Sequence, residues 1–90
     1  MWQLTLYTRE GCGLCEEMKA VIRKVGEEVP LQLGEVDVDG TADLKEKLGH
    51  EVPVLFINGR KAFKYRLTAR DLRKRLAGKS DRRIDETGSL

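Results

Sequence analysis

The two cysteines of this 90-residue chain, Cys12 and Cys15, stand at C-x-x-C spacing between a strand pattern and a helix pattern. Met1 to Thr8 alternates apolar and polar residues with the period of two that is typical of a strand. From Leu14 to Val29, apolar residues recur at helical spacing, and Pro30 marks the expected stop. The sequence therefore predicts a strand, a short loop that holds the cysteines, and a helix.

This placement indicates redox chemistry. If the helix begins near Cys12, the two Cβ atoms lie roughly 5 to 6 Å apart on one helix face, and modest adjustment permits a disulfide. Unpaired amides and the positive end of the helix dipole stabilise a thiolate at this position, and cysteines in such motifs have pKa values lowered from ~8.5 to about 3.5 to 7.5. We expect Cys12 to be the nucleophile and the deeper Cys15 to be the resolving cysteine.

Two other interpretations of the pair stay open. A structural zinc site needs four ligands, and besides the two cysteines the chain offers only His50 of the usual nitrogen and sulfur donors, so a metal or cluster would have to be shared between subunits. An inert structural disulfide would close a loop too short to remove much entropy from the unfolded chain. The sequence by itself predicts no metal site within one subunit.

Chain length and hydropathy limit the number of domains and the expected cellular location. Ninety residues are enough for one domain with one core. The first residues lack the basic segment and the long apolar segment of a signal peptide, and no apolar stretch approaches the ~20 residues of a membrane span. We therefore expect a cytoplasmic protein without a membrane partner, in a compartment where a C-x-x-C pair is mostly reduced.

Charge is unevenly distributed along the chain. Residues 1–59 carry six basic and eleven acidic residues, a net charge of −5, whereas residues 60–79 carry nine basic residues and only Asp71 as an acid, a net charge of +8. A basic stripe of this kind suits nucleic acid or an acidic partner, although a solvated helix face also explains it. We expect no nucleic-acid role.

A second strand and a second helix follow Pro30. Leu31 to Asp39 reads as a strand whose apolar phase switches across Gly34-Glu35, as a bulge or a strand buried on both faces would require. Residues 42–48 suggest a short helix that is capped by Thr41 and stopped by Gly49.

The last third of the sequence predicts a hairpin and a helix. The apolar run Val54 to Ile57 indicates a buried strand, and Asn58-Gly59 is a strong signal for a type I′ turn into a partner strand over residues 60–66. Thr68 and Asp71 have the spacing of a capping box that opens a helix ending at Gly78. We expect a domain over residues 1–78 and a flexible tail over residues 79–90.

The order strand, helix, strand, helix, hairpin, helix predicts an α/β fold of the type βαβαββα. Its four-stranded mixed sheet should have helices on both faces, with the first two strands as parallel neighbours. The cysteines would lie beyond the carboxyl end of the first strand, where open α/β sheets place their sites.

The run Tyr7-Thr-Arg-Glu-Gly-Cys-Gly-Leu-Cys-Glu-Glu-Met18, the element order and the Val52-Pro53 pair before the third strand together resemble the thioredoxin superfamily. The chain is most similar to the small bacterial glutaredoxin-like proteins, over roughly residues 2–77. This resemblance implies a thioredoxin-like fold, a cis bond at Pro53 and no bound cofactor. It also implies that the backbone of Val52 pairs with a bound disulfide segment, like an added strand.

The resemblance implies further substrate-binding residues. Arg9 matches a basic residue that contacts glutathione, and Thr68 and Asp71 stand where the last helix begins. The chain departs from the pattern at two places. The usual Gly-Gly before the last helix is absent, so that Leu67 narrows the glutathione site, and Gly13-Leu14 fills the motif where proline is usual.

The sequence thus predicts a dithiol-disulfide oxidoreductase that reduces protein disulfides or glutathione mixed disulfides. We expect a monomer whose reductant is glutathione or a reductase partner. Two alternatives from other classes stay open. One is an iron–sulfur cluster carrier that bridges two subunits through Cys12, and the other is a non-catalytic binding module that recruits a partner through its basic last helix.

Overall fold

The predicted order of elements is confirmed by a computed structural model that describes residues 1–77. The elements are β1 (Trp2–Thr8), α1 (Gly13–Gly26), β2 (Leu31–Asp37), the 3-10 turn η1 (Val38–Gly40), α2 (Ala42–Leu48), β3 (Val54–Ile57), β4 (Arg60–Lys64) and α3 (Ala69–Ala77). The predicted helix stop at Gly78 and the predicted flexible tail over residues 79–90 lie outside the described residues.

The four strands form one mixed sheet in the order β2-β1-β3-β4. β1 pairs with β2 in parallel, as expected for two strands that are joined by a helix, and β1–β3 and β3–β4 are antiparallel. The predicted four-stranded mixed sheet is confirmed.

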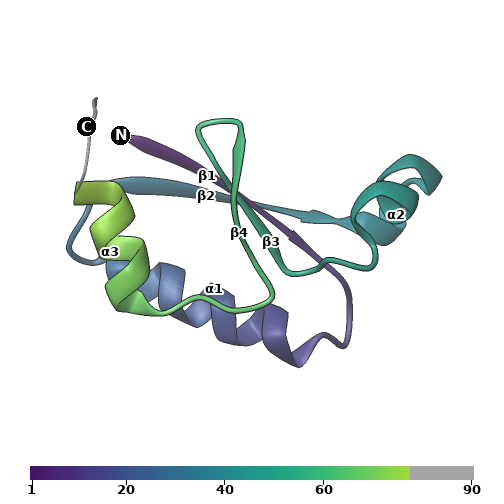
Figure 1. The fold of residues 1–90 in the computed structure, drawn as a ribbon, viewed down its shortest axis with the longest axis horizontal. Coiled ribbons are helices and arrows are strands. Elements are labelled where there is room, and N and C mark those ends of the chain that lie inside the picture. Colours follow the sequence, from purple (N-terminus) through teal and green to yellow (C-terminus); the bar gives the residue numbers. More distant parts are fainter. Residues whose placement is uncertain (78–90) are drawn as a thin grey trace.

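The two faces of the sheet are covered unequally. Leu4, Leu6, Leu55 and Ile57 point to the face that packs on α1 and α3, and Leu72 of α3 completes this core. Both helices lie on the same side of the strands (Figure 1). Because alternate strand residues point to opposite faces, β3 contributes to both cores.

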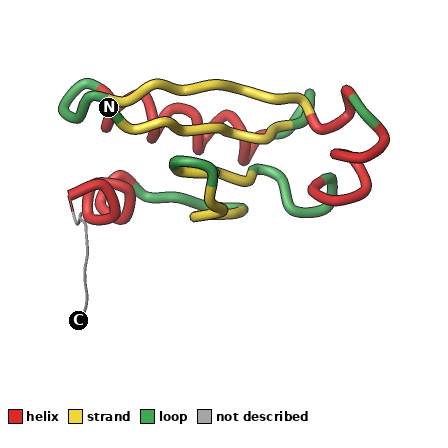
Figure 2. The backbone as a smooth tube through the Cα atoms, turned by 90° about the horizontal axis from the view of Figure 1, so that it is seen from above, coloured by secondary structure: helices red, strands yellow, loops and turns green. Residues whose placement is uncertain are grey.

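The second core lies on the other face, where Val54 packs with Val38 and Leu48. It brings α2 against one end of the sheet, the end far from α3 (Figures 1 and 2). Helices therefore lie on both faces, but α2 covers only part of its face.

The structure shortens the predicted second strand and settles its phase switch. The register between β1 and β2 is unbroken from Trp2↔Leu31 to Thr8↔Asp37, so there is no bulge. Leu31 and Leu33 pack against the first core and Val38 against the second, so this segment is buried on both sides in turn. It leaves the sheet after Asp37, whose side chain accepts a hydrogen bond of 2.9 Å from the amide of Asp39 and starts η1.

Local signals set most helix ends. The hydroxyl of Thr41 accepts a hydrogen bond of 3.2 Å from the amide of Leu44, as predicted for the cap of α2. α1 ends at Gly26 rather than at Pro30, but the amide of Val29 still donates to the carbonyl of Val25 at 2.9 Å. The end of α1 thus loosens into a turn before the proline.

The hairpin turn has the predicted type I′ conformation, with φ of 50° at Asn58 and 84° at Gly59. The Asn58 side chain also accepts a hydrogen bond of 3.0 Å from the amide of Gln3, which ties the turn to β1. β4 ends at Lys64, two residues earlier than expected, because Tyr65 has a φ of 70° and cannot continue a strand.

None of the helices in the described part of the chain is long and apolar enough to cross a membrane.

Candidate active site

Three connections lead off the same end of the sheet. Tyr7 of β1 lies opposite Val54 of β3, and Val54 lies opposite Lys64 of β4. The loop of residues 9–12 follows β1, Val52 and Pro53 precede β3, and residues 65–68 follow β4. The strand register therefore brings these segments together, although they are distant in the sequence.

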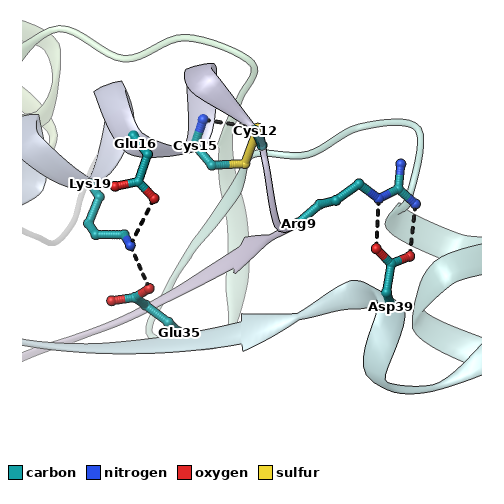
Figure 3. Close-up of a disulfide and its surroundings, with 7 residues drawn as sticks. All are labelled: Arg9, Cys12, Cys15, Glu16, Lys19, Glu35 and Asp39. Atoms are coloured by element: carbon teal, nitrogen blue, oxygen red, sulfur yellow. Dashed lines mark hydrogen bonds and ion pairs between the residues drawn. A yellow bond between two sulfur atoms is a disulfide. The ribbon is translucent and has the colours of Figure 1, made fainter.

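The two cysteines form a disulfide, with their Cα atoms 5.2 Å apart. Cys12 is the N-cap of α1, and its sulfur accepts a hydrogen bond of 3.0 Å from the amide of Cys15 (Figure 3). The side chain of Cys12 is half-buried, whereas Cys15 is only 1% exposed. The arrangement presents one sulfur to a partner molecule and keeps the other behind it.

The loop before Cys12 turns sharply at Gly11, which has a φ of 77°. A side chain is strained in this conformation, whereas glycine adopts it readily. The amide of Cys12 donates to the carbonyl of Arg9 at 3.3 Å, and this bond closes the turn. The turn leads the chain into α1 and places Cys12 at the N-cap of this helix.

The guanidinium of Arg9 is held by Asp39 rather than by the disulfide. Its Nε and Nη2 atoms donate to the two carboxylate oxygens of Asp39 at 3.0 and 3.1 Å, and the side chain extends away from Cys12 (Figure 3). These hydrogen bonds raise the pKa of Arg9 and lower the pKa of Asp39. The pair joins the cysteine loop to η1.

Gly49, at the end of α2, lies against this ion pair. A Cβ atom at Gly49 would lie 3.0 Å from Nη2 of Arg9 and would collide with the carbonyl oxygen of Lys45. Gly49 has a right-handed φ of −56°, so its role is close approach and not a left-handed turn.

Acidic residues surround the start of α1. Lys19, whose side chain is 15% exposed, lies between Glu16 and Glu35 at 3.2 and 2.9 Å (Figure 3), and both hydrogen bonds raise its pKa, that to Glu35 more strongly. Glu10 and Glu17 are exposed and form no ion pair with any residue in 1–77. Negative charge close to Cys12 opposes a thiolate, whereas the helix terminus favours it.

The Val52–Pro53 peptide bond is cis, and Pro53 is buried. The carbonyl of Pro53 accepts a hydrogen bond of 2.8 Å from the amide of Tyr65. Within residues 1–77, neither the amide nor the carbonyl of Val52 pairs with another backbone group. An extended segment could use these free groups.

A groove of about 150 Å³ opens beside the motif. One wall consists of residues of α1, namely Leu14, Glu17 and Met18, and the other consists of residues 65–68, namely Tyr65, Arg66, Leu67 and Thr68. Leu67 narrows the groove as a wall residue and also packs against the core.

The two predicted site residues at the start of α3, Thr68 and Asp71, differ in their position relative to the groove. Thr68 lines the groove, and its hydroxyl accepts a hydrogen bond of 3.0 Å from the amide of Asp71. This is half of the predicted capping box, because among residues 1–77 the carboxylate of Asp71 accepts no hydrogen bond from the amide of Thr68. Asp71 does not line the groove.

The sequence did not identify Tyr65 and Asp39 as residues of the candidate site. Tyr65 stands in a stretch that lacks the usual glycines, and its positive φ at the end of β4 has no local signal. Asp39 lies thirty residues from Arg9. Both depend on contacts that are distant in the sequence.

No group of three or more His, Cys, Asp or Glu residues within 1–77 is placed to hold a metal ion.

Residues 3–77 match the family described as Glutaredoxin-like domain (DUF836). An X-ray structure of a target protein from X. campestris is 31% identical, with a TM-score of 0.71, 82% of this chain covered and 95% of that chain. A solution structure of a protein from Nitrosomonas europaea is 32% identical, with a TM-score of 0.71, 82% of this chain covered and 89% of that chain. A chloroplastic thioredoxin z, 18% identical over 86% of this chain and 76% of its own, has a TM-score of 0.69 and supports the thioredoxin-like fold alone.

Proposed function

Because this chain belongs to the glutaredoxin-like domain family, within the thioredoxin superfamily, we propose that it is a thiol–disulfide oxidoreductase. It would reduce protein disulfides or glutathione mixed disulfides through Cys12 and Cys15. The observation that carries this proposal is the asymmetry of the pair: Cys12 is half-buried at the cap of α1, and Cys15 is buried behind it.

The reaction begins with the reduced protein. The thiolate of Cys12 attacks one sulfur of the substrate disulfide, and the other sulfur leaves as a thiolate that takes up a proton. The thiolate of Cys15 then attacks the sulfur of Cys12 and releases the second substrate thiol. Two electrons pass to the substrate, and the Cys12–Cys15 disulfide of the structure is the oxidised product.

Helix geometry supports the first step. The amide of Cys15 already donates to the sulfur of Cys12, and a thiolate accepts such a hydrogen bond more strongly than a neutral sulfur does. The helix dipole adds a favourable interaction at the same place.

The backbone of Val52, which has no backbone hydrogen bond among residues 1–77, supports a strand-like contact with the substrate beside Pro53. Thr68 contributes a wall of the groove. Substrate binding by Arg9 and Asp71 stays a prediction: Asp39 holds the guanidinium of Arg9, and Asp71 lies outside the groove lining.

Glutathione or a reductase partner would return the disulfide to the dithiol, and no bound cofactor is needed for either exchange. We propose that a monomer carries out the cycle, because both cysteines come from one subunit.

The first test is the reduction potential of the Cys12–Cys15 pair. The protein is equilibrated in glutathione buffers of known ratio, and the thiols are counted after alkylation. We expect a reversible intramolecular disulfide between about −180 and −270 mV, the range of working dithiol oxidoreductases. Bound metal, or glutathione adducts without this disulfide, would favour the cluster carrier or a one-thiol mechanism instead.

Cysteine variants separate the two roles. Cys12→Ser should abolish disulfide reduction, because the nucleophile is lost. Cys15→Ser should trap the mixed disulfide on Cys12, which mass spectrometry detects as the added mass of the substrate. Full activity of Cys12→Ser would overturn the assignment, and anaerobic purification with iron analysis tests the cluster carrier directly.

A further inference from the structure

Tyr65 is an exposed aromatic residue of the groove that opens beside the C-x-x-C motif. It is 43% exposed, and within residues 1–77 the only other exposed large hydrophobic side chain is that of Met1. Tyr65 lines the groove together with Leu14, one of the two residues between the cysteines. An exposed aromatic side chain in a groove is typical of a binding contact.

The backbone of Tyr65 is fixed in an uncommon conformation. Its φ of 70° is strained for a bulky residue, and its amide donates to the carbonyl of Pro53 at 2.8 Å. The hydroxyl contacts the carbonyl of His50 at 3.5 Å, and the ammonium of Lys64 lies 5.3 Å from the ring centroid. Tyr65 is therefore held against the segment that contains the cis-proline.

Positive charge continues from the groove along α3. Residues 60–77 contain eight basic residues and only Asp71 as an acid. Arg66 lines the groove, and Arg66, Arg70 and Lys74 are exposed without an ion pair among residues 1–77. A ligand that extends from the groove toward α3 meets cations.

The opposite wall carries the reverse charge. Glu17 of α1 lines the groove and has no cationic partner among residues 1–77. An acidic group that sits near Glu17 is repelled, whereas one that sits near Arg66 is attracted. The two walls therefore orient a charged ligand.

We propose that Tyr65 and Arg66 are specificity-determining residues that select an extended, acidic polypeptide segment of a disulfide substrate over glutathione. This inference rests on the proposed function and names its substrate class. The segment next to the substrate cysteine packs on the ring of Tyr65, and its acidic side chain lies on the Arg66 side. In the structure the guanidinium of Arg9 is paired with Asp39, whereas Arg66 at the groove has no ion-pair partner among residues 1–77.

The test uses short synthetic peptides, each a symmetrical disulfide through one cysteine, whose flanking residues are glutamate, glutamine or lysine. The reduced full-length protein is mixed with each peptide, or with glutathione disulfide, and the reaction is stopped by alkylation. Mass spectrometry then gives the rate at which the Cys12–Cys15 dithiol is oxidised.

We expect the glutamate peptide to react about threefold faster than the glutamine peptide at low salt, the size of effect of an exposed charge pair. Arg66→Gln should remove this preference. Arg60→Gln, at the far end of β4 from the groove, is the matched control and should keep it. Equal rates with the glutamate and lysine peptides in the wild type would overturn the charge selection.

Tyr65→Gly removes the ring at a position where glycine relieves the strain. We expect the rate with both glutamate and glutamine peptides to fall about fivefold, while the rate with glutathione disulfide changes by less than about twofold. Tyr65→Phe keeps the ring and should retain the peptide rates. An equal loss with peptides and glutathione disulfide would show that Tyr65 has no role in selection.

The outcomes separate the two proposals. If even a reactive aromatic disulfide fails to oxidise the dithiol, the oxidoreductase proposal fails. If all disulfides react but glutathione disulfide reacts faster than the acidic peptide, the oxidoreductase proposal stands and the selection by Tyr65 and Arg66 is wrong.

Discussion

At the scale of single residues, Tyr65 shows how a contact can hold an unfavourable backbone conformation. A left-handed conformation costs an L-residue about 1–2 kcal/mol. Here the hydrogen bond from the amide of Tyr65 to the carbonyl of Pro53 holds it. Such conformations persist where surrounding structure fixes them, often at functional sites.

This conformation reverses the usual order of two substitutions. Tyr65→Gly and Tyr65→Ala both remove the ring, but only alanine keeps the strain at φ 70°. We expect the glycine variant to be more stable than the alanine variant by about 1 kcal/mol. Urea unfolding followed by circular dichroism measures both free energies of unfolding.

Glu46 supplies the control for this prediction, because it is exposed within α2 and has a helical backbone. There the alanine variant should be more stable than the glycine variant by about 1 kcal/mol. The same order at Tyr65 and Glu46 would show that the left-handed conformation carries no cost.

At the scale of elements, the Arg9–Asp39 pair joins the cysteine loop to η1, next to α2. The two side chains are 35% and 39% exposed, so solvent weakens the attraction. Its geometry is nevertheless specific, because two parallel hydrogen bonds fix the plane of the guanidinium.

Asp39→Asn should make this contribution visible through its pH dependence. The pKa of Asp39 is lowered by the hydrogen bonds from Arg9. A lowered carboxyl pKa adds stability above the ordinary value of about 3.9 and loses it as the pH falls through the folded-state pKa. The wild type should therefore be more stable than Asp39→Asn at pH values above about 4, with a difference that disappears in acid.

Urea unfolding across this pH range tests the expectation. Asp43→Asn is the control, because Asp43 is 78% exposed and lies 3.6 Å from Lys47 in a pair within α2. A difference between the wild type and Asp39→Asn that grows as the pH falls would contradict the assigned role.

At the scale of the whole molecule, β1 and β3 belong to two cores. The larger core joins the sheet to α1 and α3, and the smaller core joins it to α2. α3 is also tied to the turn that follows α1 by the ion pair of Arg73 with Glu28 at 2.7 Å. Since these elements share the central strands, we expect the domain to unfold as one unit.

Leu72→Ala tests this coupling. Leu72 is fully buried, and its truncation should lower the free energy of unfolding by about 2–5 kcal/mol. That is a large fraction of the about 5–15 kcal/mol of a typical domain. The urea transition followed by circular dichroism should move to lower concentration and stay single.

Arg70→Ala is the matched control on the exposed side of α3 and should change the free energy of unfolding by less than about 0.5 kcal/mol. Two separate transitions in Leu72→Ala would show that the cores unfold independently.

The sequence by itself determined the elements and the redox pair, because these depend on neighbouring residues. Apolar periodicity marks β1 and α1, Asn58-Gly59 fixes the hairpin, and the C-x-x-C spacing places both cysteines on one helix turn. Each signal acts over a few residues, where the backbone has few alternatives.

Only the tertiary structure decided how the surroundings of the pair are built. Asp39 pairs with Arg9, thirty residues away, and the amide of Tyr65 donates to the carbonyl of Pro53. Leu31 and Leu33 of β2 pack in the larger core, whereas Val38, just after this strand, packs in the smaller one. The close fit at Gly49 likewise follows from the packing of α2 beside Arg9. These contacts depend on the register of the sheet, and local sequence does not encode which distant side chain will lie within hydrogen-bond distance.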